Sequence, residues 1–374
     1  MVTLSNPLRK LEELGQSIWI DFIRRGMISS GELRRLIEDD GVSGVTSNPS
    51  IFEKAIVDSH DYDSAIRSMA IAGKNIKEIY EILAVEDIQS VADLLHATYD
   101  RLQGADGFVS LEVSPKLAHD TYGTIVEARH LWTEVNRPNA FIKVPATSDG
   151  LPAIQQLISE GINVNITLLF GLPRYRQVAE AYIAGLESRA AQGKSVKQIA
   201  SVASFFLSRI DTVLDPLMEK LFSSDEKKTD IAKKAHGQVA IASAKAAYQI
   251  YKEIFSSTRF KKLVDQGVRA QRLLWASTST KNPDYNDIKY IESLIGADTI
   301  NTVPLETINA YRDHGDPKSR LEQEVKEAAD IMEQLPELGI SIDKVTQQLE
   351  DEGIKKFNES FDKLMEALTK KISV

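Results

Sequence analysis

Short runs rich in Val and Ile alternate along the chain with longer segments in which apolar residues recur every three or four positions. In the short runs the apolar side chains occupy neighbouring positions, which is typical of strands that are covered on both faces. The longer segments have the period of helices with one apolar face. The pattern predicts eight strands, at residues 18–22, 44–47, 108–113, 140–144, 163–168, 199–204, 272–277 and 299–303.

The segments between these strands predict helices. Ser29-Ser30-Gly31-Glu32 fits a capping box at the start of one of them. Residues 226–255 predict one long helix, because they are rich in Ala and Lys and contain neither Pro nor a run of β-branched residues. Further helices are expected within residues 75–101, 119–135, 157–160 and 175–191.

The repeated order of strand and helix predicts a parallel sheet with right-handed crossovers. Eight such units favour closure into an α/β barrel of the (β/α)8 TIM type. The alternative is an open doubly wound sheet, but that fold has fewer strands and a glycine-rich first turn. Neither feature is found in this chain, so we expect the barrel.

The strand pattern stops after Pro317, and residues 319–335 and 343–372 predict two helices joined by Pro336-Glu337-Leu338-Gly339. This part has few aromatic and many charged residues, so it would bury little surface alone. We therefore expect residues 1–316 to form the catalytic barrel. Residues 317–374 should form a helical C-terminal extension packed on it, not an independent domain.

The composition limits the class of function. Of the 374 residues, 43% are hydrophobic and 26% charged, as in soluble globular proteins. The formal charge of −9 argues against binding to nucleic acid. The chain has no Cys, which excludes disulfides, thiolate metal sites and cysteine nucleophiles. It has no secretory signal pattern and no run of about 18 apolar residues, so we expect a cytoplasmic protein without membrane contact, either a monomer or a homodimer.

Common cofactor motifs fail on inspection. Gly193-Lys194-Ser195 resembles the end of a P-loop, but Ser188 stands where the first glycine belongs, and the segment follows a helix instead of a strand. No Gly-x-Gly-x-x-Gly occurs, and the six His residues form no pair at the spacing of metal ligands. We therefore expect neither a metal nor a cofactor.

Polar side chains stand near the carboxyl ends of nearly all the predicted strands, where barrel enzymes carry their chemistry. Solvation of strand ends would explain the Ser, Thr and Asn residues equally well, but it does not explain a lysine inside an apolar run. The residues concerned are Asp21, Thr46, Asn48, Glu112, Lys143, Asn165, Thr167, Ser204, Ser277, Asn301 and Thr302.

Lys143 is flanked by Ile142 and Val144. One explanation is a buried ion pair with Asp21 or Glu112. The other is a Schiff-base amine, because burial disfavours the ammonium form and a neutral amine can attack a ketone. The resulting iminium accepts electrons during carbon–carbon cleavage, and Asp21 and Glu112 are candidates for moving the protons. The two explanations are compatible.

Five segments carry a family pattern in the family's order and at the spacing of barrel strands. They are Ser17-Ile18-Trp19-Ile20-Asp21, Gly44-Val45-Thr46-Ser47-Asn48-Pro49-Ser50, Ser110-Leu111-Glu112-Val113-Ser114-Pro115, Phe141-Ile142-Lys143-Val144-Pro145-Ala146-Thr147 and Gly161-Ile162-Asn163-Val164-Asn165-Ile166-Thr167-Leu168. In these segments the chain resembles the transaldolases along nearly its whole length. Its length and final helical segment are similar to the bacterial subgroup with longer chains.

The resemblance implies roles for individual residues. Lys143 would form the Schiff base with the donor ketose, and Asp21 would take and return the C4-hydroxyl proton. Glu112, with Thr167 holding a water, would serve imine formation and proton transfer. In substrate binding, Asn48 and Asn165 would hold the dihydroxyacetone unit, Arg209 would bind the phosphate, and Ser204 would line the pocket.

The segment after the seventh strand departs from the better-known subgroup, in which an arginine on the phosphate follows the serine by two residues. Here the serine is Ser277, and Ser279 stands at the arginine's place. Lys281 would replace that arginine as a point charge without the bidentate fork.

The resemblance implies a transferase of the non-oxidative pentose phosphate pathway, with sugar phosphates as its small-molecule partners. It would move a dihydroxyacetone unit from sedoheptulose 7-phosphate or fructose 6-phosphate to glyceraldehyde 3-phosphate or erythrose 4-phosphate. Two alternatives stay open at this point. One is a related Schiff-base aldolase that releases dihydroxyacetone. That relative is shorter, with Gln at the place of Glu112 and Tyr near Phe206. The other is an inactive barrel that serves as a binding protein.

Overall fold

Eight parallel strands close into a barrel in the computed structural model, which describes residues 6–372. Each strand pairs with the next, and β8 pairs with β1. The predicted (β/α)8 TIM barrel is therefore confirmed, with every predicted strand in place. The strands are β1 Gln16–Ile20, β2 Val42–Val45, β3 Phe108–Glu112, β4 Ala140–Pro145, β5 Val164–Leu169, β6 Ser201–Phe206, β7 Arg272–Ala276 and β8 Thr299–Val303.

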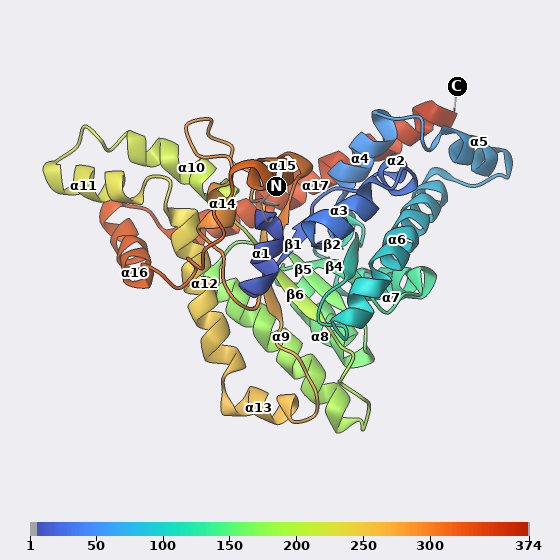
Figure 1. The fold of residues 1–374 in the computed structure, drawn as a ribbon, viewed down its shortest axis with the longest axis horizontal. Coiled ribbons are helices and arrows are strands. Elements are labelled where there is room, and N and C mark those ends of the chain that lie inside the picture. The colour runs from blue at the N-terminus through green and yellow to red at the C-terminus, as the bar shows by residue number, and fades with distance from the viewer. Residues whose placement is uncertain (1–5, 373–374) are drawn as a thin grey trace, which may run out of the picture.

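Helices surround the strands on the outside of the barrel (Figure 1). Before β4 they are α1 Pro7–Glu13, α2 Arg25–Ser29, α3 Glu32–Asp40, α4 Pro49–Val57, α5 Asp63–Ile71, α6 Ile76–Arg101, the 3-10 turn η1 Pro115–Leu117 and α7 Thr121–Val135. After β4 they are α8 Gly150–Glu160, α9 Leu172–Ala191, α10 Ser208–Glu219, α11 Glu226–Ala235, α12 Val239–Phe255, α13 Thr258–Val264, α14 Lys289–Glu292, α15 Leu305–His314, α16 Val325–Gln334, η2 Leu335–Leu338 and α17 Ile342–Ile372.

The predicted capping box at Ser29 and Glu32 is wrong. Ser29 is the last residue of α2, and α3 begins after Gly31, whose φ of 77° puts the backbone in the left-handed region that glycine tolerates. The reciprocal bonds of a capping box occur instead at the start of α6, between Asn75 and Glu78.

The predicted long helix over residues 226–255 is divided into α11 and α12. His236 ends the first helix, and Gly237 takes a φ of 67°. Buried carboxylates then satisfy the backbone where α12 starts, because Asp215 accepts from the Gly237 amide and Asp211 from the Ala240 amide, each at 2.8 Å. The break thus combines a helix-ending glycine, Gly237, with two acids that come from α10.

One glycine governs the packing inside the barrel. A Cβ on Gly44 of β2 would lie 2.3 Å from the ring atoms of Trp19, which is buried on β1. Native cores have no space for such an overlap. Gly44 therefore allows the indole of Trp19 to lie against the neighbouring strand, where its Nε1 donates to Asp106 at 2.8 Å.

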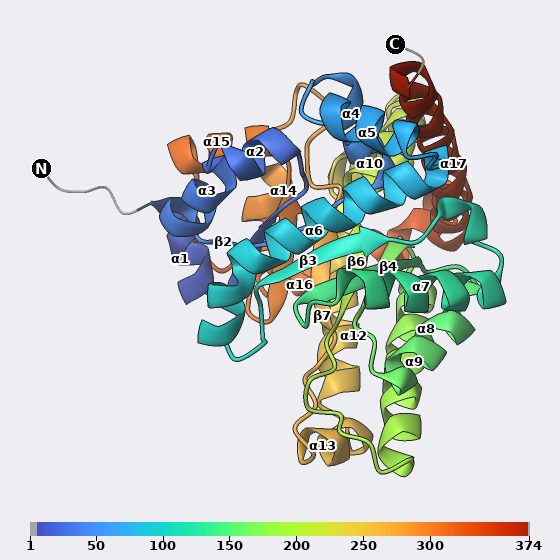
Figure 2. The ribbon, with the colours of Figure 1, turned by 90° about the vertical axis from the view of Figure 1, so that its right-hand side faces the viewer.

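The last helix, α17, passes along the carboxyl-end side of the barrel from α10 to α5 (Figures 1 and 2). Its buried residues recur with a helical period. Three ion pairs fasten it to the barrel helices and to η1. They join Arg174 to Glu350 at 3.3 Å, Lys116 to Asp362 at 2.8 Å, and Lys371 to Asp63 at 2.5 Å.

The C-terminal part begins with a shorter helix than expected, since α16 starts at Val325 after Glu324 takes a φ of 51°. The Pro336–Gly339 connection forms the turn η2. No helix within residues 6–372 is both long enough and apolar enough to cross a membrane.

Candidate active site

A cavity of about 340 Å³ opens at the carboxyl ends of the barrel strands. Side chains from most of the strands and from α4, α10 and α17 line it. The sequence-predicted site residues among them are Asp21, Asn48, Lys143, Thr167, Ser204, Arg209, Ser277 and Lys281. Of the other two predicted residues, Glu112 contacts Lys143 from the lining of a neighbouring cavity, and Asn165 is fully buried.

Lys143 is the central amine of this site. Its side chain extends from β4, and the residue is only 5% exposed. Nζ donates to the carbonyl oxygen of Ser47 at 2.9 Å and to Glu112 Oε2 at 3.1 Å. Of the two ion pairs that the sequence allowed, the structure therefore shows the pair with Glu112.

Glu112 reaches Lys143 because the Cα atoms of these residues are paired across β3 and β4. Burial raises the pKa of the Glu112 carboxyl, and the nearby ammonium of Lys143 opposes that rise. Glu112 Oε1 and Thr167 Oγ1 are both buried and have no hydrogen-bond partner among the described residues. Unsatisfied buried oxygens of this kind are suited to hold a water that moves protons.

Asp21 follows the last residue of β1 and is partly buried. Thr46 Oγ1 donates to Asp21 Oδ1 at 2.6 Å and lies 2.7 Å from Thr302 Oγ1. Burial raises the pKa of Asp21, while Lys143, the Thr46 hydroxyl and Lys281 act to lower it. A carboxyl with a raised pKa next to an amine is suited to general acid and base chemistry.

Asn48 is held by the start of α4. Its Oδ1 caps the helix by accepting from the Ile51 amide at 3.1 Å. That bond fixes the side chain at the cavity wall, and its Nδ2 makes no hydrogen bond to the described residues. The amide N–H groups are thus positioned to donate to a bound hydroxyl or carbonyl.

Asn165 already has hydrogen-bond partners on both sides. It is paired with Lys143 across β4 and β5 and is fully buried. Its Nδ2 donates to Ser110 Oγ at 3.0 Å, and its Oδ1 accepts from Ser204 Oγ at 2.6 Å. Ser204 itself lies inside β6, because that strand ends two residues later than predicted.

Arg209 supplies a cation near the cavity rim. It makes no salt bridge to any residue between 6 and 372, and its guanidinium lies 5.6 Å from the ring centre of Phe206. Burial lowers the pKa of Arg209, which records the cost of holding an unpaired charge there. A bound anion would remove that cost.

The loop after β7 adds a second cation. Lys281 Nζ donates to Ser279 Oγ at 2.6 Å, so the two residues that replace the expected arginine contact each other. Ser277 has a φ of 53°, a backbone conformation that costs energy in a residue other than glycine. Such strain is common at functional sites.

Sequence reasoning missed several lining residues, among them Lys54 on α4, Glu306 on α15 and Phe357 on α17. Lys54 lies six residues beyond Asn48, on the helix that Asn48 caps, and that spacing was the available signal. Phe357 had no such signal, because it stands among residues of α17 that follow the helical period of an ordinary buried face.

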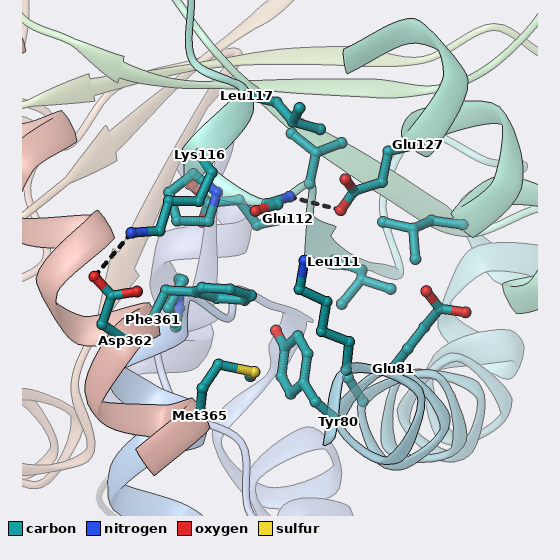
Figure 3. Close-up of a pocket in the computed structure, with 17 residues that line it drawn as sticks. Tyr80, Glu81, Leu111, Glu112, Lys116, Leu117, Glu127, Phe361, Asp362 and Met365 are labelled. Carbon is teal, nitrogen blue, oxygen red and sulfur yellow. Dashed lines mark hydrogen bonds and ion pairs between the residues drawn. The ribbon is translucent and has the colours of Figure 1, made fainter. Parts of the chain in front are cut away.

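A larger cavity, of about 430 Å³, lies on the outer side of β3 between α6, α7 and α17 (Figure 3). Phe361 and Met365 face Tyr80 across it (Figure 3). Two of its charged groups already have partners, Lys116 with Asp362 and Glu81 with His130 at 2.7 Å. Glu112 lines this cavity too, but no buried amine that could serve as a nucleophile does, so the reacting amine belongs to the smaller cavity.

Comparison with known proteins decides the family. The family model described as transaldolase/fructose-6-phosphate aldolase matches residues 18–368. The chain belongs to this family. It is 48% identical over 373 residues to a transaldolase of Trichodesmium erythraeum and 49% identical over 377 residues to transaldolase 2 of Nostoc punctiforme, with 99% of this chain and 98% of each relative covered. A transaldolase of Thiobacillus denitrificans is 44% identical over 360 residues, with 96% of this chain and 99% of the relative covered.

These full-length matches support transaldolase function, which makes the protein an enzyme of the transferase class. Schiff-base chemistry and the pentose phosphate pathway are standard for the transaldolase family. The barrel described above supplies a buried lysine for that chemistry.

Proposed function

We propose that this protein carries out the transaldolase reaction through a Schiff base on Lys143. It transfers a dihydroxyacetone unit from sedoheptulose 7-phosphate or fructose 6-phosphate to glyceraldehyde 3-phosphate or erythrose 4-phosphate. The observation that carries this proposal is the buried amine of Lys143, within 3.1 Å of a carboxylate and at the floor of a cavity that also holds Asp21.

Imine formation uses Glu112 and Thr167. A deprotonated Lys143 attacks the C2 carbonyl of the donor, and the carbinolamine then loses water. A water held between Glu112 Oε1 and Thr167 Oγ1 carries the protons, since both oxygens lack another partner. Glu112 also stabilises the cationic iminium, because its Oε2 already faces the nitrogen.

Cleavage uses Asp21. The ionised carboxylate removes the proton of the C4 hydroxyl, the C3–C4 bond breaks, and the electron pair moves into the iminium as an enamine. The aldose product leaves. The enamine carbon attacks the acceptor aldehyde, and Asp21 returns the proton to the new hydroxyl. Asn48 donates to the hydroxyls of the dihydroxyacetone unit, while Asn165 fixes Ser204 and the floor beneath Lys143.

Arg209 and Lys281 bind the phosphate of either sugar. The support is that both side chains line the cavity of Lys143 and that Arg209 makes no salt bridge within residues 6–372. The cations explain how a protein with a charge of −9 can attract anionic sugars. We further propose that the enzyme works in the cytoplasm, where these sugar phosphates occur.

The test is borohydride trapping. Fructose 6-phosphate and borohydride should give a covalent adduct whose mass gain maps to Lys143, and Lys143→Arg should give none while circular dichroism shows it folded. An adduct at another lysine would overturn the proposal. Measuring donor cleavage with and without erythrose 4-phosphate then separates transfer from simple aldol cleavage, and strong acceptor dependence is expected.

A further inference from the structure

Phe357 of α17 lines the same cavity as Lys143, although it belongs to the C-terminal helix and not to the barrel. It is 7% exposed. Phe206 and Arg209 line this cavity as well, with the guanidinium over the Phe206 ring. Phe357 thus adds an apolar ring from the C-terminal helix to a cavity that the barrel lines with both polar and apolar side chains.

Gly353 brings the helix close enough for this contact. A Cβ on Gly353 would lie 2.9 Å from Leu168 Cδ2 and 3.6 Å from Arg209 Nη1. Residues four positions apart share one face of a helix, so Phe357 extends the face that Gly353 presents to the rim. The helix backbone therefore runs directly over the ends of β5 and β6.

The cover is fixed in place on both sides of Phe357. The Arg174–Glu350 pair is largely buried and lies two turns before it, and the Lys116–Asp362 pair lies just after it. At the end of α17, Lys371 pairs with Asp63 and donates to the Ser59 carbonyl oxygen. Such anchors favour a permanent wall over a mobile lid.

The transaldolase intermediate makes this wall important. The enamine carbon has two possible fates. It attacks the acceptor aldehyde, forming a carbon–carbon bond while Asp21 protonates the new alkoxide. Alternatively, the carbon takes a proton from water, water adds to the iminium carbon, the carbon–nitrogen bond breaks, and dihydroxyacetone leaves the free amine with one water consumed. The second fate needs a proton donor at the enamine carbon, whereas the attack on the aldehyde does not, so the access of water to that carbon sets the ratio of the two.

We infer that Phe357 is a specificity-determining residue that keeps water from the enamine, so that the dihydroxyacetone unit is transferred and not released. The inference rests on the proposed function. It assigns to the C-terminal helix a part in the chemistry that the barrel residues alone do not supply.

Phe361 offers a matched control. It lies one turn beyond Phe357 on the same helix and has the same 7% exposure, but it lines the larger outer cavity and packs against Tyr80 with ring centres 5.8 Å apart (Figure 3). Phe357→Ala and Phe361→Ala therefore remove equal side chains from the same helix, and only the first opens the substrate cavity.

The experiment measures two rates with fructose 6-phosphate, dihydroxyacetone release without acceptor and transfer to erythrose 4-phosphate. We expect Phe357→Ala to raise the ratio of release to transfer about tenfold, and Phe361→Ala to leave it within about twofold of the unchanged protein. An unchanged ratio in Phe357→Ala, or an equal rise in Phe361→Ala, would overturn the inference.

Two further measurements keep the test decisive. If Phe357→Ala does not fold, as judged by circular dichroism, the comparison is made between Phe357→Leu and Phe361→Leu, with an expected difference of about threefold in the same ratio. Equal ratios in that pair would overturn the inference. Borohydride trapping of the unchanged protein separates the two proposals, because a missing Lys143 adduct contradicts the function itself, whereas a normal adduct with equal ratios contradicts only the role of Phe357.

Discussion

Lys143 Nζ and Glu112 Oε2 lie 3.1 Å apart because their residues stand at paired positions on neighbouring strands of the barrel. The contact shows the ion pair that the sequence allowed for Lys143, and it is compatible with the predicted catalytic amine. Glu112 accepts a hydrogen bond from the amine with Oε2, while its Oε1 has no hydrogen-bond partner among residues 6–372.

We predict that Glu112→Gln slows imine formation. The substitution removes the negative charge beside the iminium and the acceptor of its protons, and general acid–base catalysis contributes about 10²- to 10⁴-fold. The rate of borohydride trapping should fall by about 10²-fold or more, while the final adduct still maps to Lys143. Glu127→Gln, a partly buried acid of the outer cavity, is the control and should trap at the normal rate; equal trapping rates in the two variants would contradict the role of Glu112.

Asp21→Asn should separate imine formation from cleavage. The amide cannot accept the C4-hydroxyl proton, so kcat should fall by about 10²- to 10⁴-fold while the borohydride adduct still forms. Quantitative trapping together with product analysis checks this. Loss of the adduct in a folded Asp21→Asn protein would show that the carboxylate acts before cleavage.

The raised pKa of Asp21 has opposite consequences for activity and stability. As a base the carboxyl must be ionised, so kcat should fall as the pH drops through the raised pKa. The folded state favours the protonated form of Asp21, so this form stabilises the fold at pH values below the pKa that Asp21 has in the unfolded chain. The stabilisation is lost as the pH rises through the pKa of Asp21 in the folded protein. Asp21→Asn should therefore have a higher Tm than the unchanged protein at neutral pH, with a smaller difference near pH 4.

Thr46 provides the check on that pH dependence. Its hydroxyl bond acts to lower the pKa of Asp21, so Thr46→Val should raise this pKa further and move the acid limb of the kcat profile to higher pH. A profile that does not move, or that moves to lower pH, would show that another group controls the acid limb.

Arg209→Ala should weaken phosphate binding. A charged hydrogen bond contributes about 1.5–3 kcal/mol, which corresponds to a KM for fructose 6-phosphate about 10- to 100-fold higher. Fructose, which lacks the phosphate, is the diagnostic substrate. It should react with Arg209→Ala about as well as with the unchanged protein. Lys281→Ala and Lys54→Ala remove exposed point charges and should raise KM less. Equal losses with both sugars would place Arg209 outside the phosphate site.

Gly44→Ala should destabilise the barrel strongly. Its new Cβ would overlap the buried ring of Trp19, and neither strand has space to move. We expect a loss of about 3 kcal/mol or more in the free energy of unfolding, measured by urea titration. Gly193→Ala is a useful comparison because its Cβ meets no atom within 4 Å; the positive φ of Gly193 should still cost about 1 kcal/mol. A similar loss in both variants would contradict the packing argument.

The eight strands were predictable because each one is a short run of neighbouring apolar side chains, and helical segments separate most of them. Boundaries were less certain. β6 ends two residues later than predicted, because its pairing with β7 continues to Phe206. Ser204 therefore lies inside the strand. The division of residues 226–255 had one local signal, Gly237, while Asp211 and Asp215, which satisfy the backbone at the break, approach from another helix and leave none.

The sequence by itself determined the barrel, the buried lysine and the acids that could serve it, because strand periodicity and a charge inside an apolar run are local properties. Only the tertiary structure decided which acid contacts Lys143, that Asn165 bonds to Ser110 and Ser204, and that Phe357 reaches the site. Those facts depend on strand register and on the path of α17 across the barrel, which bring together residues from different strands and helices. Such contacts are set by packing, and a pattern within one segment does not encode them.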